Sequence, residues 1–269
     1  MKLTYLGTAA AEGYPAVFCN CDYCREARVL GGKNIRTRSQ TLINDDLLID
    51  FPADTYHHFL MNNIEGDKIK YLLVTHSHSD HFYVKDFYLR QDVYAHNMRV
   101  PEMKMYCSKV TADVLPSAPK NIEVNVIEPF QTVDLGDYKV TTLPARHMPG
   151  GEPLFYIIKG EKTLLYAHDT GYFYEEVFKY IEDNKIRFDM VSFDCTNVDL
   201  PISDEGSHMG FPNIERVLNK LISMGAVDSD TVKYVNHFSH NGNPRHDILE
   251  ERASSYGCLV SYDGCKVEF

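Results

Sequence analysis

The sequence of 269 residues contains no tryptophan, no long apolar run and no excess of basic residues. No run approaches the ~20 apolar residues of a membrane-spanning helix, so we expect no membrane association. The chain carries 27 Lys and Arg against 38 Asp and Glu, a formal net charge of −11. This balance argues against a protein that covers nucleic acid with a basic face. The start, Met1-Lys2-Leu3-Thr4-Tyr5, shows no signal-peptide core, so we expect a cytoplasmic protein.

The chain does have enough apolar residues for a folded core, 44% of the total, which argues against disorder. No repeat, low-complexity segment or linker divides it, so we expect a single domain over residues 1–269. Short β-rich runs with helical patterns between them predict two sheets flanked by helices. The predicted strands cover residues 2–7, 41–51, 70–76, 104–107, 122–128, 138–143, 154–159, 163–168, 189–195 and 232–238. The clearest helix has an apolar stripe from Ile214 to Ile222 and starts near Pro212, and weaker patterns cover residues 174–181 and 246–255.

A histidine cluster follows the apolar run at residues 71–75. It reads His76-Ser77-His78-Ser79-Asp80-His81 and places four metal-ligating side chains within six residues. Alternate residues of an extended segment point the same way, so His76 and His78 can hold one ion. If the chain then turns into a helix, Asp80 and His81 can reach a second ion. Imidazole suits zinc, iron or manganese, and a carboxylate neutralises charge.

The pattern His-x-His-x-Asp-His after an apolar strand resembles the signature of the metallo-β-lactamase fold superfamily. This resemblance implies an α/β (α+β) fold, the four-layer αββα sandwich, with a metal site at one edge of its two sheets. Further ligands of that family match three residues that follow predicted strands in the expected order, His147, Asp169 and His237. The resemblance assigns one metal to three histidines, His76, His78 and His147. It assigns the second metal to Asp80, His81 and His237, with Asp169 bridging the two.

Three of the seven cysteines form the cluster Cys19-x-Cys21-x-x-Cys24. In a reducing compartment such a cluster favours a structural zinc over a disulfide. A tetrahedral site needs a fourth ligand, and His240, three residues after His237, is a candidate. Cys-x-Cys-x-x-Cys with a distant His-x-x-His resembles the branch of the superfamily typified by PhnP, a phosphoribosyl cyclic phosphodiesterase. By that resemblance the structural zinc is held by Cys19, Cys21, Cys24 and His240.

The resemblance implies a metal-dependent phosphodiesterase that acts on a small phosphate ester, such as a cyclic one. Two divalent metals, zinc or manganese or else iron, would hold a bridging hydroxide that attacks phosphorus. We expect catalytic roles for two residues beside the metals. His208 lies in a polar loop where the family places a histidine, and it can protonate a leaving group or stabilise an oxyanion. Asp80 can relay a proton through its free carboxylate oxygen.

Other functions stay open on the residues alone. The same metals would serve hydrolysis of a lactone or thioester, since the ligands do not choose the electrophile. An RNA-processing nuclease shares the motif but normally carries a basic extension, so we do not expect a nucleic-acid partner for this acidic chain. A non-enzymatic binding module would have lost several ligands, whereas all seven are present. The sequence does not identify a surface that would bind a partner protein, and it is compatible with a homodimer.

Basic and histidine residues outside these motifs are predicted to be structural or solvated. Arg36 and Arg38 could bind a distal phosphate, but we expect them to form a solvated basic turn. His57 and His58 are predicted to lie on a helix after Pro52. His246 has no partner that the sequence identifies.

Overall fold

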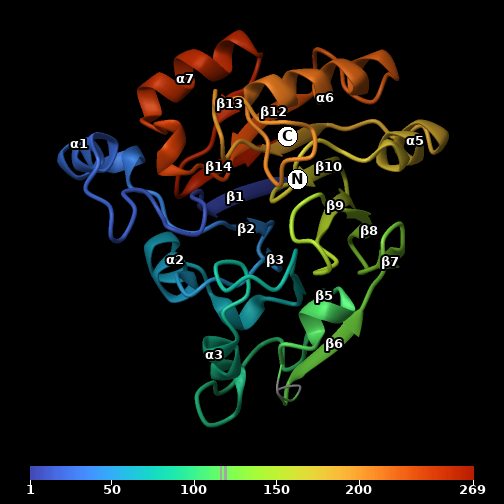
Figure 1. The fold of residues 1–269 in the computed structure, drawn as a ribbon. Coiled ribbons are helices and arrows are strands. Elements are labelled where there is room, and N and C mark those ends of the chain that lie inside the picture. Colours follow the sequence, from blue (N-terminus) through green and yellow to red (C-terminus); the bar gives the residue numbers. More distant parts are fainter. Residues whose placement is uncertain (116, 118–119) are drawn as a thin grey trace.

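The computed structural model describes residues 1–115, 117 and 120–269. Two seven-stranded sheets pack against each other (Figure 1). In spatial order the first sheet contains β14 (Cys265–Glu268), β1 (Lys2–Gly7), β2 (Gln40–Ile43), β3 (Leu47–Ile49), β4 (Tyr71–Leu73), β5 (Met103–Cys107) and β6 (Ile122–Val126). The second sheet contains β13 (Leu259–Val260), β12 (Val232–Asn236), β11 (Met190–Asp194), β10 (Thr163–Ala167), β9 (Leu154–Lys159), β8 (Lys139–Pro144) and β7 (Thr132–Asp134). The C-terminal strand β14 returns to the first sheet beside β1.

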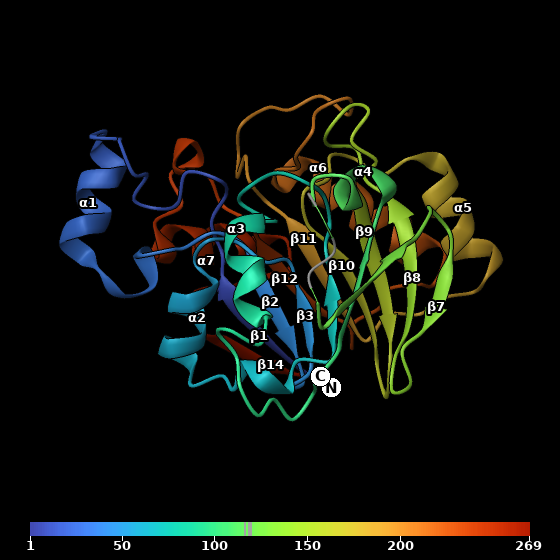
Figure 2. The same cartoon turned by 90° about the horizontal axis from the view of Figure 1, so that it is seen from below.

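Helices cover the outer faces of the two sheets (Figures 1 and 2). The first sheet is covered by α2 (Thr55–Asn62), α3 (Val84–Phe87) and α4 (Lys109–Ala112). The second sheet is covered by α5 (Glu175–Asp183), α6 (Phe211–Ser223) and α7 (His246–Ser255). This order of layers confirms the predicted αββα sandwich. Among the described residues, no helix has both the length and the apolar character needed to cross a bilayer.

Alternation along the strands divides the apolar side chains among separate cores. In β10, Leu164 and Tyr166 join the cluster between the sheets, while Leu165 and Ala167 join the cluster under α5, α6 and α7. Successive side chains of a strand point to opposite faces, so a strand covered on both sides is apolar throughout. Helix α6 buries one face at the helical period, and Pro212 lies in its first turn, as predicted.

Parallel strands bring distant parts of the chain to one edge of the sandwich. In the first sheet β3 and β4 are parallel, and in the second β10, β11 and β12 are parallel. The carboxyl ends of parallel strands lie at the same edge of a sheet, where ligands commonly bind. The predicted ligand segments after β4, β10 and β12 therefore come together there.

The single strand predicted over residues 41–51 is wrong. These residues form two short antiparallel strands, β2 and β3, joined by a turn. Asn44 in that turn has a left-handed backbone (φ 48°), which asparagine tolerates. Its side-chain oxygen accepts a hydrogen bond from the Lys2 amide at 3.0 Å. The prediction also missed the short strands β7, β13 and β14, and the helix α1 (Asp22–Leu30) after the cysteine cluster.

The solvated turn predicted at Arg36 is also wrong, because the Arg36 side chain is fully buried. Its Nη1 donates to Thr8 Oγ1 at 2.9 Å and to the carbonyl oxygen of Ser261 at 2.7 Å. Its Nη2 donates to Nδ1 of His246 at 3.0 Å, and the guanidinium lies over the Phe238 ring at 4.6 Å. All but one of these partners lie more than 200 residues away, so no local pattern reveals them. His58 is likewise buried, on α2, where the sequence predicts a helix.

A hydrogen bond between the sheets provides a test of this packing. The fully buried Tyr156 of β9 donates its hydroxyl to the Val74 carbonyl after β4, at 2.7 Å. Tyr156→Phe should lower the free energy of unfolding by about 1–3 kcal/mol, because a buried carbonyl loses its partner. Urea denaturation measures this change. The matched control, Tyr56→Phe on the exposed side of α2, should change it by less than about 0.5 kcal/mol, and equal effects would contradict the assignment.

Candidate metal centre

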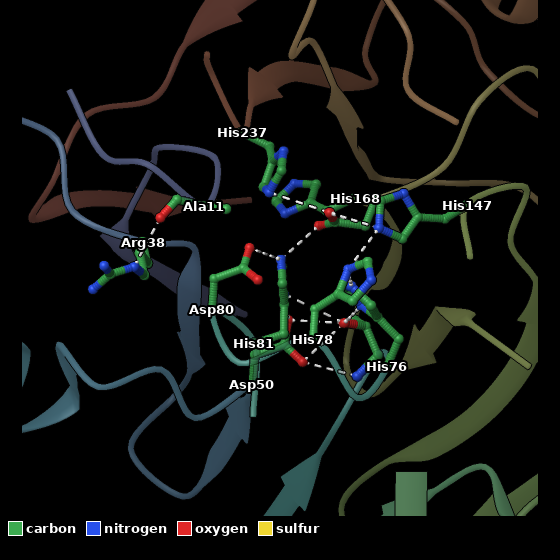
Figure 3. Close-up of polar contacts among 12 residues, drawn as sticks. Ala11, Arg38, Asp50, His76, His78, Asp80, His81, His147, His168 and His237 are labelled. Atoms are coloured by element: carbon green, nitrogen blue, oxygen red, sulfur yellow. Dashed lines mark hydrogen bonds and ion pairs between the residues drawn. The ribbon is translucent and has the colours of Figure 1, made fainter. Parts of the chain in front are cut away.

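The predicted ligands lie at the carboxyl ends of strands from both sheets. His76 follows β4 in the first sheet. In the second sheet His147 follows β8, Asp169 follows β10 and His237 follows β12. Figure 3 shows the imidazoles gathered around one space, those of His76, His78, His81, His147 and His237. Both halves of the chain therefore contribute to one cluster.

Four overlapping groups of ligand atoms form within this cluster, and two of them are the predicted ligand groups. In the first, Nδ1 of His78 lies 2.8 Å from Nε2 of His76 and 3.2 Å from Nε2 of His147. The second comprises Asp80, His81 and His237, with His81 Nε2 3.4 Å from Asp80 Oδ2. Atoms bound tetrahedrally to one zinc at 2.0–2.1 Å stand about 3.3 Å apart. The spacing in these groups therefore fits donor atoms around a cation.

Asp169 lies between the two groups. Its Oδ2 is 3.1 Å from Nε2 of His81, while its Oδ1 is 3.2 Å from Nε2 of His237 and 3.8 Å from Nε2 of His147. Three of these buried atoms have no hydrogen-bond partner among the described residues, namely Asp169 Oδ2, His81 Nε2 and His237 Nε2. Leaving buried polar atoms unpaired is costly. Because the three converge on one another, the residues present fit bound divalent ions, and the ligation itself stays a prediction.

The electrostatics of the cluster also fit cations. Burial lowers the pKa of His76 and of His147, which favours the neutral imidazole that binds metals. Burial acts in the same direction on His81, but nearby carboxylates, with Asp169 the largest contributor, raise the pKa of His81 well above its ordinary value. The carboxylates thus require positive charge nearby, which a divalent ion would supply.

Hydrogen bonds on the far side of two of the rings fix the orientation of His81 and His237. His81 Nδ1 lies 2.7 Å from Asp50 Oδ2, and His237 Nδ1 lies 2.8 Å from Thr196 Oγ1. Both bonds use Nδ1 and leave Nε2 facing the centre, as in histidines that bind metals. Sequence analysis missed Asp50 and Thr196. Asp50 does end an apolar strand, as the ligands do, and this is the signal that could have found it.

Three residues of the site have a left-handed backbone: Asp50 (φ 66°), Asp169 (φ 52°) and His237 (φ 64°). Residues other than glycine seldom adopt this conformation, which costs about 1–3 kcal/mol at each position. Asp50 and His237 come directly after β3 and β12, and Asp169 lies two residues after the end of β10. The regular sheets on either side must therefore hold these strained residues in place.

His208 and Asp194 form a pair beside the cluster. Asp194 ends β11, is fully buried, and accepts a hydrogen bond at Oδ2 from His208 Nδ1 at 2.7 Å. Burial opposes protonation of His208, yet the charge of Asp194 and this hydrogen bond raise the pKa of His208 to about 9. The His208 ring lies 4.6 Å from the His147 ring and 5.4 Å from the His237 ring, centre to centre. His208 thus lies at the edge of the cluster, and Asp194 is a third partner that sequence analysis missed.

The residues predicted to hold a structural zinc also meet. The ligand atoms of all four lie within 4.8 Å of one another, those of Cys19, Cys21, Cys24 and His240. Cys21 Sγ lies 3.7 Å from His240 Nδ1, and the Ala16 amide donates to Cys24 Sγ at 3.3 Å. Burial would raise the pKa of Cys21, but hydrogen bonds, first that with His240, lower it to about 6. Burial raises the pKa of Cys24 to about 12, so Cys21 is the thiol most ready to bind zinc, which takes the thiolate.

A sequence profile described as "Beta-lactamase superfamily domain" matches residues 48–228, more than half of the chain. The chain belongs to this superfamily. The family resemblance based on the His-x-His-x-Asp-His motif is thereby confirmed. A search of curated proteins found no match.

Several solved structures share the fold of this chain. One is a new diphosphatase from the PhnP family, with 20% identity, a TM-score of 0.74, and coverage of 100% of this chain and 97% of that one. Zn²⁺-bound PqqB from Methylobacterium extorquens has 16% identity and a TM-score of 0.73, with 100% of both chains covered. The short form of human tRNase Z has 14% identity and a TM-score of 0.62, with 100% and 99% covered. At these identities the likeness establishes the shared fold.

The cysteine cluster leads to a prediction about metal content. Cys21→Ser should remove about one zinc per chain and lower the melting temperature, because a tetrahedral site loses one of its four ligands. Mass spectrometry of metals in the purified protein measures the loss. The control, Cys258→Ala, removes a buried cysteine outside the cluster and should keep the full metal content. Equal zinc in the two variants would contradict the site.

Proposed function

We propose that the protein is a metal-dependent hydrolase that cleaves a small phosphodiester at this cluster. The observation that carries the proposal is the position of Asp169, whose carboxylate contacts both groups: His81 and His237 at 3.1 and 3.2 Å, and His147 at 3.8 Å. This arrangement suits a pair of divalent ions, zinc, manganese or iron, with Asp169 between them. Such ions supply Lewis acidity and neutralise charge on phosphoryl oxygens. One group would comprise His76, His78 and His147, and the other Asp80, His81 and His237.

Within this proposal, His208 donates a hydrogen bond or a proton to the substrate. Its Nδ1 is already engaged by Asp194, so Nε2 is the nitrogen left for substrate. The Asp194 carboxylate favours the protonated ring, which can give its proton to a departing alkoxide oxygen. Asp80 Oδ2 faces His81, and the second oxygen of Asp80 can accept or pass on a proton. The roles of His208 and Asp80 follow from their positions beside the ligand groups.

The proposed substrate is a small ester of phosphate rather than RNA. A net charge of −11 disfavours binding of a long polyanion, whereas one phosphodiester group needs only local positive charge. Two proteins with the same fold support chemistry at phosphorus: one is named as a diphosphatase of the PhnP family and one as tRNase Z. A cyclic phosphodiester remains within the proposed class, as the cysteine motif implies.

Activity on a substrate panel tests the proposal. Purified protein loaded with zinc or manganese should hydrolyse bis(p-nitrophenyl) phosphate or phosphoribosyl cyclic phosphate, and Asp169→Ala should lower turnover about a hundredfold or more with the fold kept. Release of p-nitrophenolate and of phosphomonoester gives the rates, and circular dichroism checks the fold. The control is Asp45→Ala, at an exposed aspartate before the start of β3, at the opposite end of that strand from Asp50, which should keep full activity.

Two results would overturn the proposal. One is hydrolysis of a lactone or thioester with none of either phosphodiester, which would indicate the carbonyl chemistry that the same ligands permit. The other is unchanged turnover in Asp169→Ala.

The loop that carries His208 provides an independent prediction. It packs so closely on Gly171 that a Cβ there would lie 1.8 Å from the Gly206 carbonyl oxygen. The next residue, Ser207, accepts a hydrogen bond at its carbonyl from His147 Nδ1 at 3.1 Å. Gly171→Ala must therefore displace the loop, and a shift of about 1 Å can lower kcat about a hundredfold. Gly160→Ala, where the nearest atom would be 3.3 Å away, should leave kcat unchanged, and equal rates in both variants would contradict the assigned role of the loop.

A further inference from the structure

A cavity lies on the outer side of the first sheet, away from the ligand groups. It has a volume of about 240 Å³ and lies between α2, η2 (Gly66–Lys68) and the segment from α3 to the start of β5. Figures 1 and 2 show α2 and α3 on this side of the molecule. Most of its wall is apolar, with large contributions from Phe51, Phe59, Phe87, Ile69, Met98 and Met103. Tyr56 and Leu89 line the cavity and are well exposed, so the cavity is open to solvent beside them.

Two of the polar side chains in the wall are already satisfied. The Thr55 hydroxyl donates to the Pro52 carbonyl at 2.7 Å and accepts from Gln40 Nε2 at 3.0 Å. The Asp67 carboxylate is bound at both oxygens by Arg99, through Nε and Nη2 at 2.6 Å each. Neither group needs a ligand.

Arg90 differs from these groups. Its Nη2 donates to the Val100 carbonyl, but its buried Nε has no hydrogen-bond partner among the described residues. Its guanidinium forms no ion pair within 4.0 Å among the described residues. Burial lowers the pKa of Arg90, and the charge of Asp67, a carboxylate already bound by Arg99, offsets this only in part. A buried donor without an acceptor in an apolar wall points to an acidic or carbonyl oxygen from a ligand.

The size of the cavity limits the apolar part of such a ligand. An engineered apolar cavity of 150 Å³ holds benzene. A cavity of about 240 Å³ therefore has room for a chain of roughly six to eight carbons. The flexible Met98 and Met103 side chains can adapt to an alkyl chain.

We propose that this cavity binds a medium-chain carboxylate, with its alkyl chain among the phenylalanine and methionine side chains and its carboxylate on Arg90. The cavity is separate from the metal cluster. Phe51 and Phe87 line it, and their rings and that of Phe82 pack together, with centres 5.5 Å (Phe51–Phe87) and 5.2 Å (Phe82–Phe87) apart. Phe51 also donates its amide to the His81 carbonyl at 2.7 Å. The ligand would thus touch residues that pack behind His81 without touching the ligand groups.

Asp86 allows a sharp test of the charge argument. It lines the same cavity four residues before Arg90 and has no ion pair or hydrogen bond of its carboxylate among the described residues. Its charge opposes an anionic ligand, whereas the charge of Arg90 attracts one. Changes at the two positions should therefore shift the affinity in opposite directions.

Isothermal titration of the full chain with sodium octanoate, below the concentration at which it forms micelles, tests the proposal. Arg90→Met keeps the apolar stem and should weaken binding about tenfold or more, while Asp86→Asn should strengthen it several-fold. Octanol, which lacks the carboxylate, should bind the native protein about tenfold more weakly than octanoate. Ala95→Phe, which fills the cavity from a surface loop, should abolish binding with the melting temperature kept.

Absence of octanoate binding at millimolar concentration, or equal affinity in the native protein and Arg90→Met, would overturn the proposal. Equal affinity in Ala95→Phe would also overturn it, because the ligand would then lie elsewhere. The titration measures binding and needs no turnover, so its outcome is independent of the phosphodiesterase proposal.

Discussion

Asp169 places a buried carboxylate between two groups of histidines, and an uncompensated charge in that position would be strongly destabilising. Its neighbours come from both sheets: His81 follows β4, while His147 and His237 follow strands of the second sheet. The sandwich must therefore be assembled before this charge can be compensated. Cations bound there would favour the packed sheets over the separated ones, so binding and folding would reinforce each other.

A four-residue segment connects the two candidate metal sites. His237 belongs to the cluster at the strand ends, and His240 belongs to the cysteine site. Phe238 between them exchanges backbone hydrogen bonds with the N-terminal loop, from its amide to the Thr8 carbonyl and from the Ala10 amide to its carbonyl, each 3.0 Å. The buried Arg36 lies on the Phe238 ring. A zinc bound at the cysteine site would thus hold in place the loop and segment from which His237 reaches the cluster.

Sequence patterns were sufficient to predict a structural feature wherever that feature depends on residues close together in the sequence. Alternation along β10 and the helical period of α6 reflect burial on fixed faces, and the order of ligands after successive strands reflects parallel strands ending at one edge. Contacts between residues that are far apart in the sequence produce no such pattern. Arg36 is buried because Ser261 and His246, far along the chain, supply its acceptors, and Asp194 joins the site through the loop that carries His208. A turn inside an apolar run, as at Asn44, was missed because the flanking residues suit one long strand.

The left-handed backbones at Asp50, Asp169 and His237 set a limit on how stable this fold can become. Each costs about 1–3 kcal/mol, a sizeable share of the 5–15 kcal/mol that separates folded from unfolded domains. Glycine would relieve the strain at any of the three positions, but it would remove the side chain that the site uses. Selection for stability and selection for activity therefore act against each other at these three residues. Compensating gains must come from elsewhere, in the sheets and their helical covers.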